Sequence, residues 1–104
     1  TYEDVIKHKP SPDAYELALQ LSKKSVVNSI AIEDSLIGVK AANAAKINCL
    51  LTLPPWSCSN HNITRTANAC VNSLGSRDNP SRLIYGKKLT SNYVDFDYLT
   101  KIIN

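Results

Sequence analysis

The stretch IAIEDSLIGVKAA, residues 30–42, joins a short apolar run to two adjacent carboxylates and then to an alanine-rich segment. Residues 30–32 are continuously apolar, which is typical of a strand covered on both faces. Ser35 is a good N-cap residue, so a helix is expected to begin directly after it and to cover about 36–46. A buried strand that passes at once into a helix is the pattern of an α/β fold.

The neighbouring segments continue this alternation. Apolar residues at helical spacing predict an amphipathic helix over about 12–22; they are Ala14, Leu17, Ala18 and Leu21. The helix at 36–46 is expected to pack on the sheet through one stripe of mostly small residues. That stripe consists of Ile37, Ala41, Ala44 and Ala45. Residues 47–53, INCLLTL, indicate a second apolar strand. The order predicts a partial Rossmann-like, three-layer α/β fold with a parallel sheet.

The second half of the chain has weaker patterns. Residues 66–75, TANACVNSLG, are interpreted as a short helix closed by Gly75. Residues 82–86, RLIYG, favour a short strand. A terminal helix is expected over 95–103, capped by Asp95. Its inward-facing side chains are expected to be Phe96, Leu99 and Ile103.

Composition limits the classes of function. The 104 residues suit one domain, and a hydrophobic fraction of 43% permits a packed core. The net charge of +3 without blocks of like charge argues against a nucleic-acid surface, and no apolar run is long enough for a membrane span. Three cysteines without close pairs favour neither a disulfide framework nor a zinc site, so a cytoplasmic protein is expected. Because the chain begins at Thr1 and contains no methionine, we expect it to be a piece of a longer protein.

The adjacent acids Glu33 and Asp34 are expected at the carboxyl end of a buried parallel strand, where α/β sheets bind ligands. Two hard oxygen ligands at that edge suit Mg²⁺, which takes one or two carboxylates together with water and phosphate oxygens. Alternatively, one carboxylate caps the following helix and the other pairs with a lysine. Lys9 lies between a histidine and a proline in KHKPSPD, so it either presents a charge to a phosphoryl oxygen or is an ordinary solvated lysine.

These motifs carry a family resemblance. KPSPDAYELALQ (9–20) followed by IEDSLIGVKAANAA (32–45) resembles the C-terminal half of the haloacid dehalogenase superfamily. The pattern is most similar to its β-phosphoglucomutase and CbbY-like phosphatase branch, whose members show GKPxPD and IEDSxxGxxAA. His8 stands where that branch has glycine, and we interpret it as a loop substitution.

The resemblance implies a role for each matching residue. Lys9 would be the catalytic lysine that neutralises the phosphate and an aspartyl nucleophile. Glu33 and Asp34 would hold Mg²⁺, with Asp34 as the more direct ligand. Ser35 would cap the helix beside the site, and Asp13 would brace the lysine loop.

The nucleophile motif, the second phosphate-binding motif and the helical cap of this family are absent from the sequence, and we expect them upstream of Thr1. Residues 1–104 would then be the C-terminal part of the core domain, inactive alone. For the intact protein the resemblance implies a Mg²⁺-dependent phosphatase that acts on a small sugar phosphate through a phospho-aspartyl intermediate. The alternatives are a phosphosugar mutase of the same fold and a non-catalytic Rossmann-like binding module.

The expected partner is a small phosphorylated metabolite rather than a nucleic acid or a membrane. A half-sheet would also leave an open strand edge beside residues 30–32. We therefore expect the chain to pack on its missing half or to self-associate.

Overall fold

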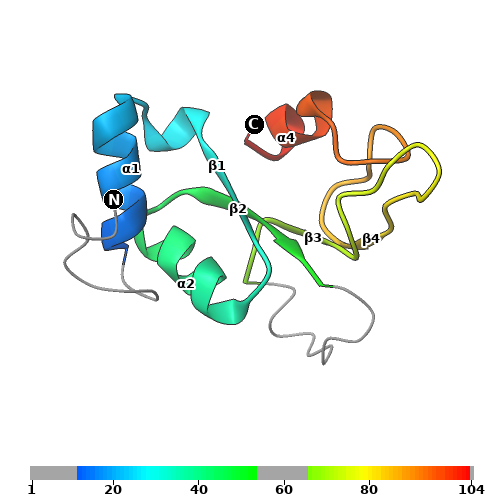
Figure 1. Ribbon diagram of the computed structural model, residues 1–104, viewed down its shortest axis with the longest axis horizontal. Coiled ribbons are helices and arrows are strands. Elements are labelled where there is room, and N and C mark those ends of the chain that lie inside the picture. Colours follow the sequence, from blue (N-terminus) through cyan, green and yellow to red (C-terminus); the bar gives the residue numbers. More distant parts are fainter. Residues whose placement is uncertain (1–11, 54–65, 104) are drawn as a thin grey trace.

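The computed structural model describes residues 12–53 and 66–103 as a four-stranded sheet with helices on both faces (Figure 1). The first half comprises α1 (Asp13–Ser22), the 3₁₀ turn η2 (Val26–Asn28), β1 (Ile30–Glu33), α2 (Leu36–Ala44) and β2 (Asn48–Thr52). The second half comprises β3 (Ala69–Val71), β4 (Leu83–Tyr85) and α4 (Phe96–Ile103). No helix in these two ranges is long and apolar enough to cross a membrane.

The strands lie in the order β1-β2-β3-β4. β1 and β2 are parallel, with Ile32 opposite Leu50, and β2 and β3 are parallel, with Thr52 opposite Val71. β4 is antiparallel to β3, so the sheet is mixed rather than purely parallel. Within the described ranges β1 pairs with β2 alone, which leaves the expected open edge. The predicted partial Rossmann-like α/β fold is confirmed.

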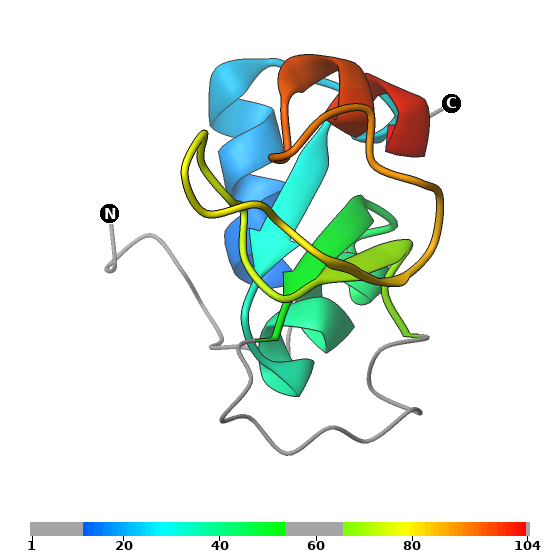
Figure 2. The same ribbon diagram turned by 90° about the vertical axis from the view of Figure 1, so that its right-hand side faces the viewer.

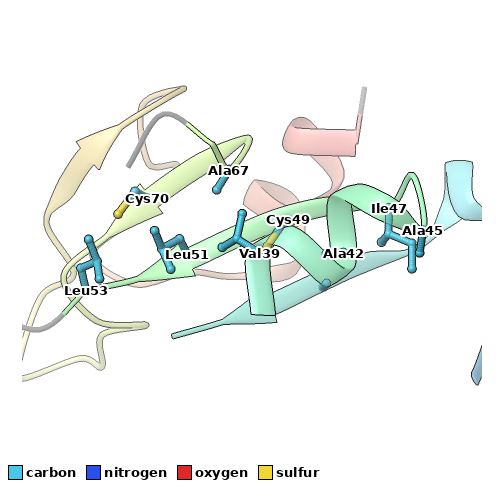
Figure 3. Packing of buried hydrophobic residues seen from close by; sticks show 10 residues of the cluster. Val39, Ala42, Ala45, Ile47, Cys49, Leu51, Leu53, Ala67 and Cys70 are labelled. Carbon is cyan, nitrogen blue, oxygen red and sulfur yellow. The ribbon is translucent and has the colours of Figure 1, made fainter. Parts of the chain in front are cut away.

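One face of the sheet is covered by α2. Val39 and Ala42 of α2 lie against Cys49 and Leu51 of β2 in a single buried cluster (Figure 3). Small side chains on the helix allow its backbone to approach the strands closely, so the crossover from β1 to β2 is compact. This packing brings the first turn of α2 next to the end of β1.

The predicted α2 stripe was partly wrong. Ala41 is buried as expected, but Ile37 is 54% exposed and Ala44 is also exposed. Val39 and Ala42, which the stripe left out, are fully buried. Nearly every residue of this helix is apolar or small, so periodicity alone does not fix its rotation about its own axis.

The orientation of α1 also differs from the prediction. Tyr15 and Leu19 pack against the buried cluster between α2 and β2, whereas Leu21 and Ala18 are exposed. The helix ends at Ser22, because the next residue, Lys23, adopts a left-handed conformation (φ 58°). Apolar residues occupy several faces of this short helix, so more than one inward face was compatible with the sequence.

The opposite face of the sheet is covered by α4, as Figure 2 shows. Tyr98 and Ile102 of α4 are buried with Leu50 and Val71 of the strands. The predicted helix and its Asp95 cap are confirmed, since an Asp95 carboxylate oxygen accepts a 2.8 Å hydrogen bond from the Tyr98 amide. The predicted inward position of Phe96 was wrong, because its side chain is 80% exposed.

The helix predicted over 66–75 was wrong, because this segment contains β3. Ala69, Cys70 and Val71 are fully buried and form a strand that pairs with β2. Apolar residues at 67, 70, 71 and 74 imitate a helical period, but the open edge of β2 offers this segment a complete set of ladder hydrogen bonds. Gly75 adopts a positive φ of 79° in the loop after β3 rather than at a helix end.

Candidate functional site

The candidate site lies at the carboxyl edge of the three parallel strands. Glu33 ends β1, Thr52 ends β2 and Val71 ends β3, so the chain leaves the sheet at the same edge three times. The Thr52 hydroxyl donates a hydrogen bond of 3.4 Å to the main-chain oxygen of Glu33. This bond ties the end of β1 to the end of β2, beside the point where Asp34 follows.

Glu33 is buried although it is ionisable. Only 8% of its surface is exposed, and strand alternation places it on the same face as Ala31, toward α2. Its carboxyl lies against the first turn of that helix, at Gly38: a Cβ added to Gly38 would overlap Oε1 and Cδ of Glu33 and would lie 3.0 Å from its Cγ. The side chain of Glu33 therefore occupies the space that any larger residue at position 38 would need.

Asp34 and Ser35 are both exposed at the junction between β1 and α2. The Ser35 hydroxyl accepts a 3.1 Å hydrogen bond from the Gly38 amide, and its carbonyl accepts one of 3.0 Å from the Val39 amide. Ser35 thus caps α2 as predicted. The two adjacent carboxylates differ in environment: Glu33 is packed against the helix, and Asp34 faces solvent.

The remaining predicted site residues are not tested by these contacts. Lys9 and His8 lie outside the described residues, so the place of Lys9 beside the acids stays a prediction. Asp13 is the first residue of α1, and its proposed bracing of the lysine loop also stays a prediction. No group of three or more His, Cys, Asp and Glu side chains that could hold a metal ion occurs among the residues described. The acids contribute at most part of a coordination shell.

Two hollows lie away from the acids, toward the amino end of β1. One of about 260 Å³ opens between α1 and the start of β1, and one of about 300 Å³ opens between β1 and α4. Ile30 lines both, and among the described residues their other linings are mostly apolar and include no carboxylate or basic group. Such linings suit packing against apolar surface rather than binding of a charged ligand.

The buried thiols are not candidate nucleophiles. Cys49 and Cys70 are fully buried on the neighbouring strands β2 and β3. Burial raises the pKa of Cys70 to about 11, so this thiol stays protonated near neutral pH. The chemistry of the described region is therefore centred on the carboxylates at the carboxyl edge.

Two residues of the site were not assigned from the sequence. Thr52 had no signal, because a threonine at the end of an apolar strand is common. Gly38 carried a signal, since a glycine inside a predicted helix is unfavourable and needs a reason in packing. Its spacing of five residues from Glu33 could have suggested that the two meet.

Three parallel strands in a mixed sheet, with an acidic pair where β1 ends and a capped helix directly after it, define an α/β protein with a candidate ligand site at its carboxyl edge. The sequence comparison gives the family. The family model described as haloacid dehalogenase-like hydrolase matches residues 1–52, half of the chain. The chain belongs to this family, which confirms the resemblance drawn from the sequence motifs.

Two curated relatives support this assignment. The chain is 42% identical over 48 residues to Protein CbbY of Cereibacter sphaeroides, a match that covers 46% of the chain and 21% of the relative. It is 38% identical over 50 residues to a haloacid dehalogenase-like hydrolase domain-containing protein of Arabidopsis thaliana, covering 48% of the chain and 16% of the relative. The matches thus span about a fifth or less of these relatives. No solved structure matches the chain.

Proposed function

We propose that the chain forms the C-terminal part of the core domain of a Mg²⁺-dependent phosphatase that acts on a small sugar phosphate. The observation that carries this proposal is the pair Glu33–Asp34 at the carboxyl end of β1 in a member of a hydrolase family. The similarity to Protein CbbY supports the branch.

The donor set fits magnesium. Carboxylate oxygens are hard ligands, and Mg²⁺ commonly takes only one or two of them while it keeps several water molecules. Asp34 is exposed and so is accessible to an ion outside the sheet edge, and Glu33 stands directly before it. When bound, the cation would neutralise charge on the oxygens of a transferring phosphoryl group.

In this proposal the residues of the chain have separate roles at the site. Asp34 would bind the ion, with Glu33 as the second acid of the pair. Ser35 keeps the start of α2 in place by its cap, which fixes the backbone that carries both acids. Lys9 would hold a phosphoryl oxygen and offset the negative charge that gathers there.

In this proposal the nucleophile is an aspartate outside the 104 residues. Its carboxylate attacks phosphorus, the bond from phosphorus to the leaving sugar oxygen breaks, and a second acid protonates that oxygen. Water then attacks the aspartyl phosphate, which releases inorganic phosphate and restores the aspartate. Positioning and charge stabilisation, rather than acid–base chemistry of the described residues, would supply this chain's share of catalysis.

The test begins with the complete coding sequence that contains these residues. We expect a DxDG motif on a strand upstream of Thr1, and Mg²⁺-dependent release of phosphate from sugar phosphates by the complete protein. Asp34→Asn should lower the rate by about 100-fold or more, since it removes a charged ligand from the site. Asp78→Asn, a change at an exposed turn, is the matched control and should leave the rate unchanged.

Two results would contradict the proposal. A complete protein without the upstream motif and without metal-dependent turnover would indicate a binding module instead. Hydrolysis of an aryl phosphate by the 104-residue chain alone, lost in Lys9→Ala, would place the nucleophile within the chain. Analysis of the products separates phosphate release from return of the phosphoryl group to the sugar, which would indicate a mutase.

A further inference from the structure

We propose that Gly38 is a positioning residue for Glu33: the missing side chain at position 38 provides the space in which the Glu33 carboxyl is held against the first turn of α2. Of the two adjacent acids, Asp34 alone faces solvent, whereas Glu33 is only 8% exposed. The inference rests on the proposed function only where it concerns the metal ion. Its structural part stands on the contacts of these residues.

The glycine has no conformational reason to be there. Gly38 lies within α2, and the glycines with positive φ are Gly75 and Gly86. Glycine is an unfavourable residue inside a helix because it has the most backbone freedom to lose, so its presence in the first turn needs an explanation. Space is the remaining explanation, and the overlap of a Cβ at this position with Oε1 and Cδ of Glu33 supplies it.

The nearest atoms that a Cβ at position 38 would meet belong to the flexible side chain of Glu33, but that side chain has little space in which to move. Glu33 is only 8% exposed, and Thr52 binds its main-chain oxygen, so the backbone of β1 has little room to shift away. A methyl group at position 38 would therefore turn the Glu33 side chain outward, toward the edge where Asp34 lies. The first turn of a helix also favours a nearby negative charge, so the displaced carboxylate would leave a favourable electrostatic position.

The first experiment needs no substitution. In the NMR spectrum of the 104-residue chain, we expect nuclear Overhauser contacts between the γ protons of Glu33 and the α protons of Gly38. Their presence places the side chain over the glycine. Their absence, with the remaining contacts between β1 and α2 observed, overturns the proposal.

The second experiment is a double-mutant cycle read by urea unfolding. Gly38→Ala should lower the unfolding midpoint when Glu33 is present, because the added methyl group displaces its carboxyl. In a Glu33→Ala background the same change should raise the midpoint, because alanine is the better helix former once the space is vacant. A midpoint that moves in the same direction in both backgrounds contradicts a specific link between the two residues.

Lys40 provides the matched control, since it is exposed in the middle of the same helix. The difference between Lys40→Ala and Lys40→Gly measures helix propensity alone, and it should be the same in the parent chain and in the Glu33→Ala background. If Glu33→Ala does not fold, Glu33→Asp, with a shorter side chain, replaces it in the cycle. The penalty of Gly38→Ala should then be smaller than in the parent chain, and an equal penalty counts against the proposal.

The third experiment measures how the activity of the complete protein depends on the Mg²⁺ concentration. Gly38→Ala should raise the Mg²⁺ concentration that gives half-maximal activity by about tenfold, the size expected when a neighbour that orients a ligand is changed. Combining it with Glu33→Asp should restore part of the Mg²⁺ affinity, whereas general loss of structure would show no such rescue. If the complete protein has no metal-dependent activity, the proposed function fails, while the proton contacts and the unfolding cycle still decide the link between Gly38 and Glu33.

Discussion

The phenol oxygen of Tyr98 lies 2.6 Å from the main-chain oxygen of Lys87 and donates a hydrogen bond to it. This bond joins α4 to the loop that follows β4, while the ring of Tyr98 is buried against Leu50 and Val71. One side chain thus fastens the C-terminal helix to both the sheet and the adjoining loop. Burial also raises the pKa of this phenol.

Replacement of Tyr98 by phenylalanine should destabilise the chain moderately. The ring remains, but the Lys87 carbonyl loses its donor, so we expect the free energy of unfolding to fall by about 1 kcal/mol. Urea unfolding measures this change, with Tyr93→Phe at an exposed position as the control. A variant as stable as the parent would show that water replaces the lost donor at no cost.

Asp95 should make stability depend on acid pH. The side chain of Thr90, the amide of Tyr98 and the side chain of Ser91 lower the pKa of Asp95 through hydrogen bonds. A lowered pKa in the folded state means that the stabilisation is present above the ordinary pKa of aspartate and is lost as the pH falls below it. Unfolding measured from about pH 6 to about pH 2 should therefore be less pH-dependent in Asp95→Asn than in the parent.

Cys70 should make the stability of the folded chain fall as the pH rises in the alkaline range, the opposite sign to the effect of Asp95. Its folded-state pKa is raised from 9.0 to about 11, so the unfolded chain releases this proton first as the pH rises. The contribution of Cys70 to stability is present below pH 9 and is lost between pH 9 and pH 11. Cys70→Ala should lower stability at neutral pH by loss of packing, yet its stability should fall less than that of the parent over this range.

We predict that the isolated chain self-associates through the open side of β1. Ile32 is 45% exposed on the face opposite Ala31 and Glu33, next to the free strand edge. Sedimentation should give a mean mass that is above the mass of a monomer and that rises with protein concentration. Ile32→Lys should reduce this mean mass. Ile37→Lys on α2, where the parent residue is 54% exposed, is the control. A parent chain that remains a dilute monomer with cooperative unfolding contradicts this prediction.

The elements around the acids could be predicted from the sequence because several local signals agree there. The apolar run of β1, the Ser35 cap and the small residues of α2 all indicate the same strand–helix junction. The side of each helix that is buried was predicted less accurately than the helices themselves. Both α1 and α2 carry apolar or small residues on more than one side, so tertiary contacts decide which side is buried.

The segment of β3 could not be identified, because its state depends on a neighbour. Residues 69–71 become a strand since β2 offers a free edge to them, and three residues are too few to show an alternating pattern. At the site, adjacent carboxylates and a strand end were readable from the sequence. The burial of Glu33 was not predicted, although Gly38, against which its carboxyl lies, is an unfavourable residue inside the expected helix and so carried a signal.

The central position of β2 has a consequence for the order in which parts of the molecule open. β2 has a hydrogen-bonded neighbour on each side, whereas β1 has one among the residues described. Amide protons of β2 should therefore exchange with solvent more slowly than those of β1, and the strand that carries Glu33 should open earlier. A segment that pairs with β1 would slow exchange there and would make the carboxyl edge as rigid as the middle of the sheet.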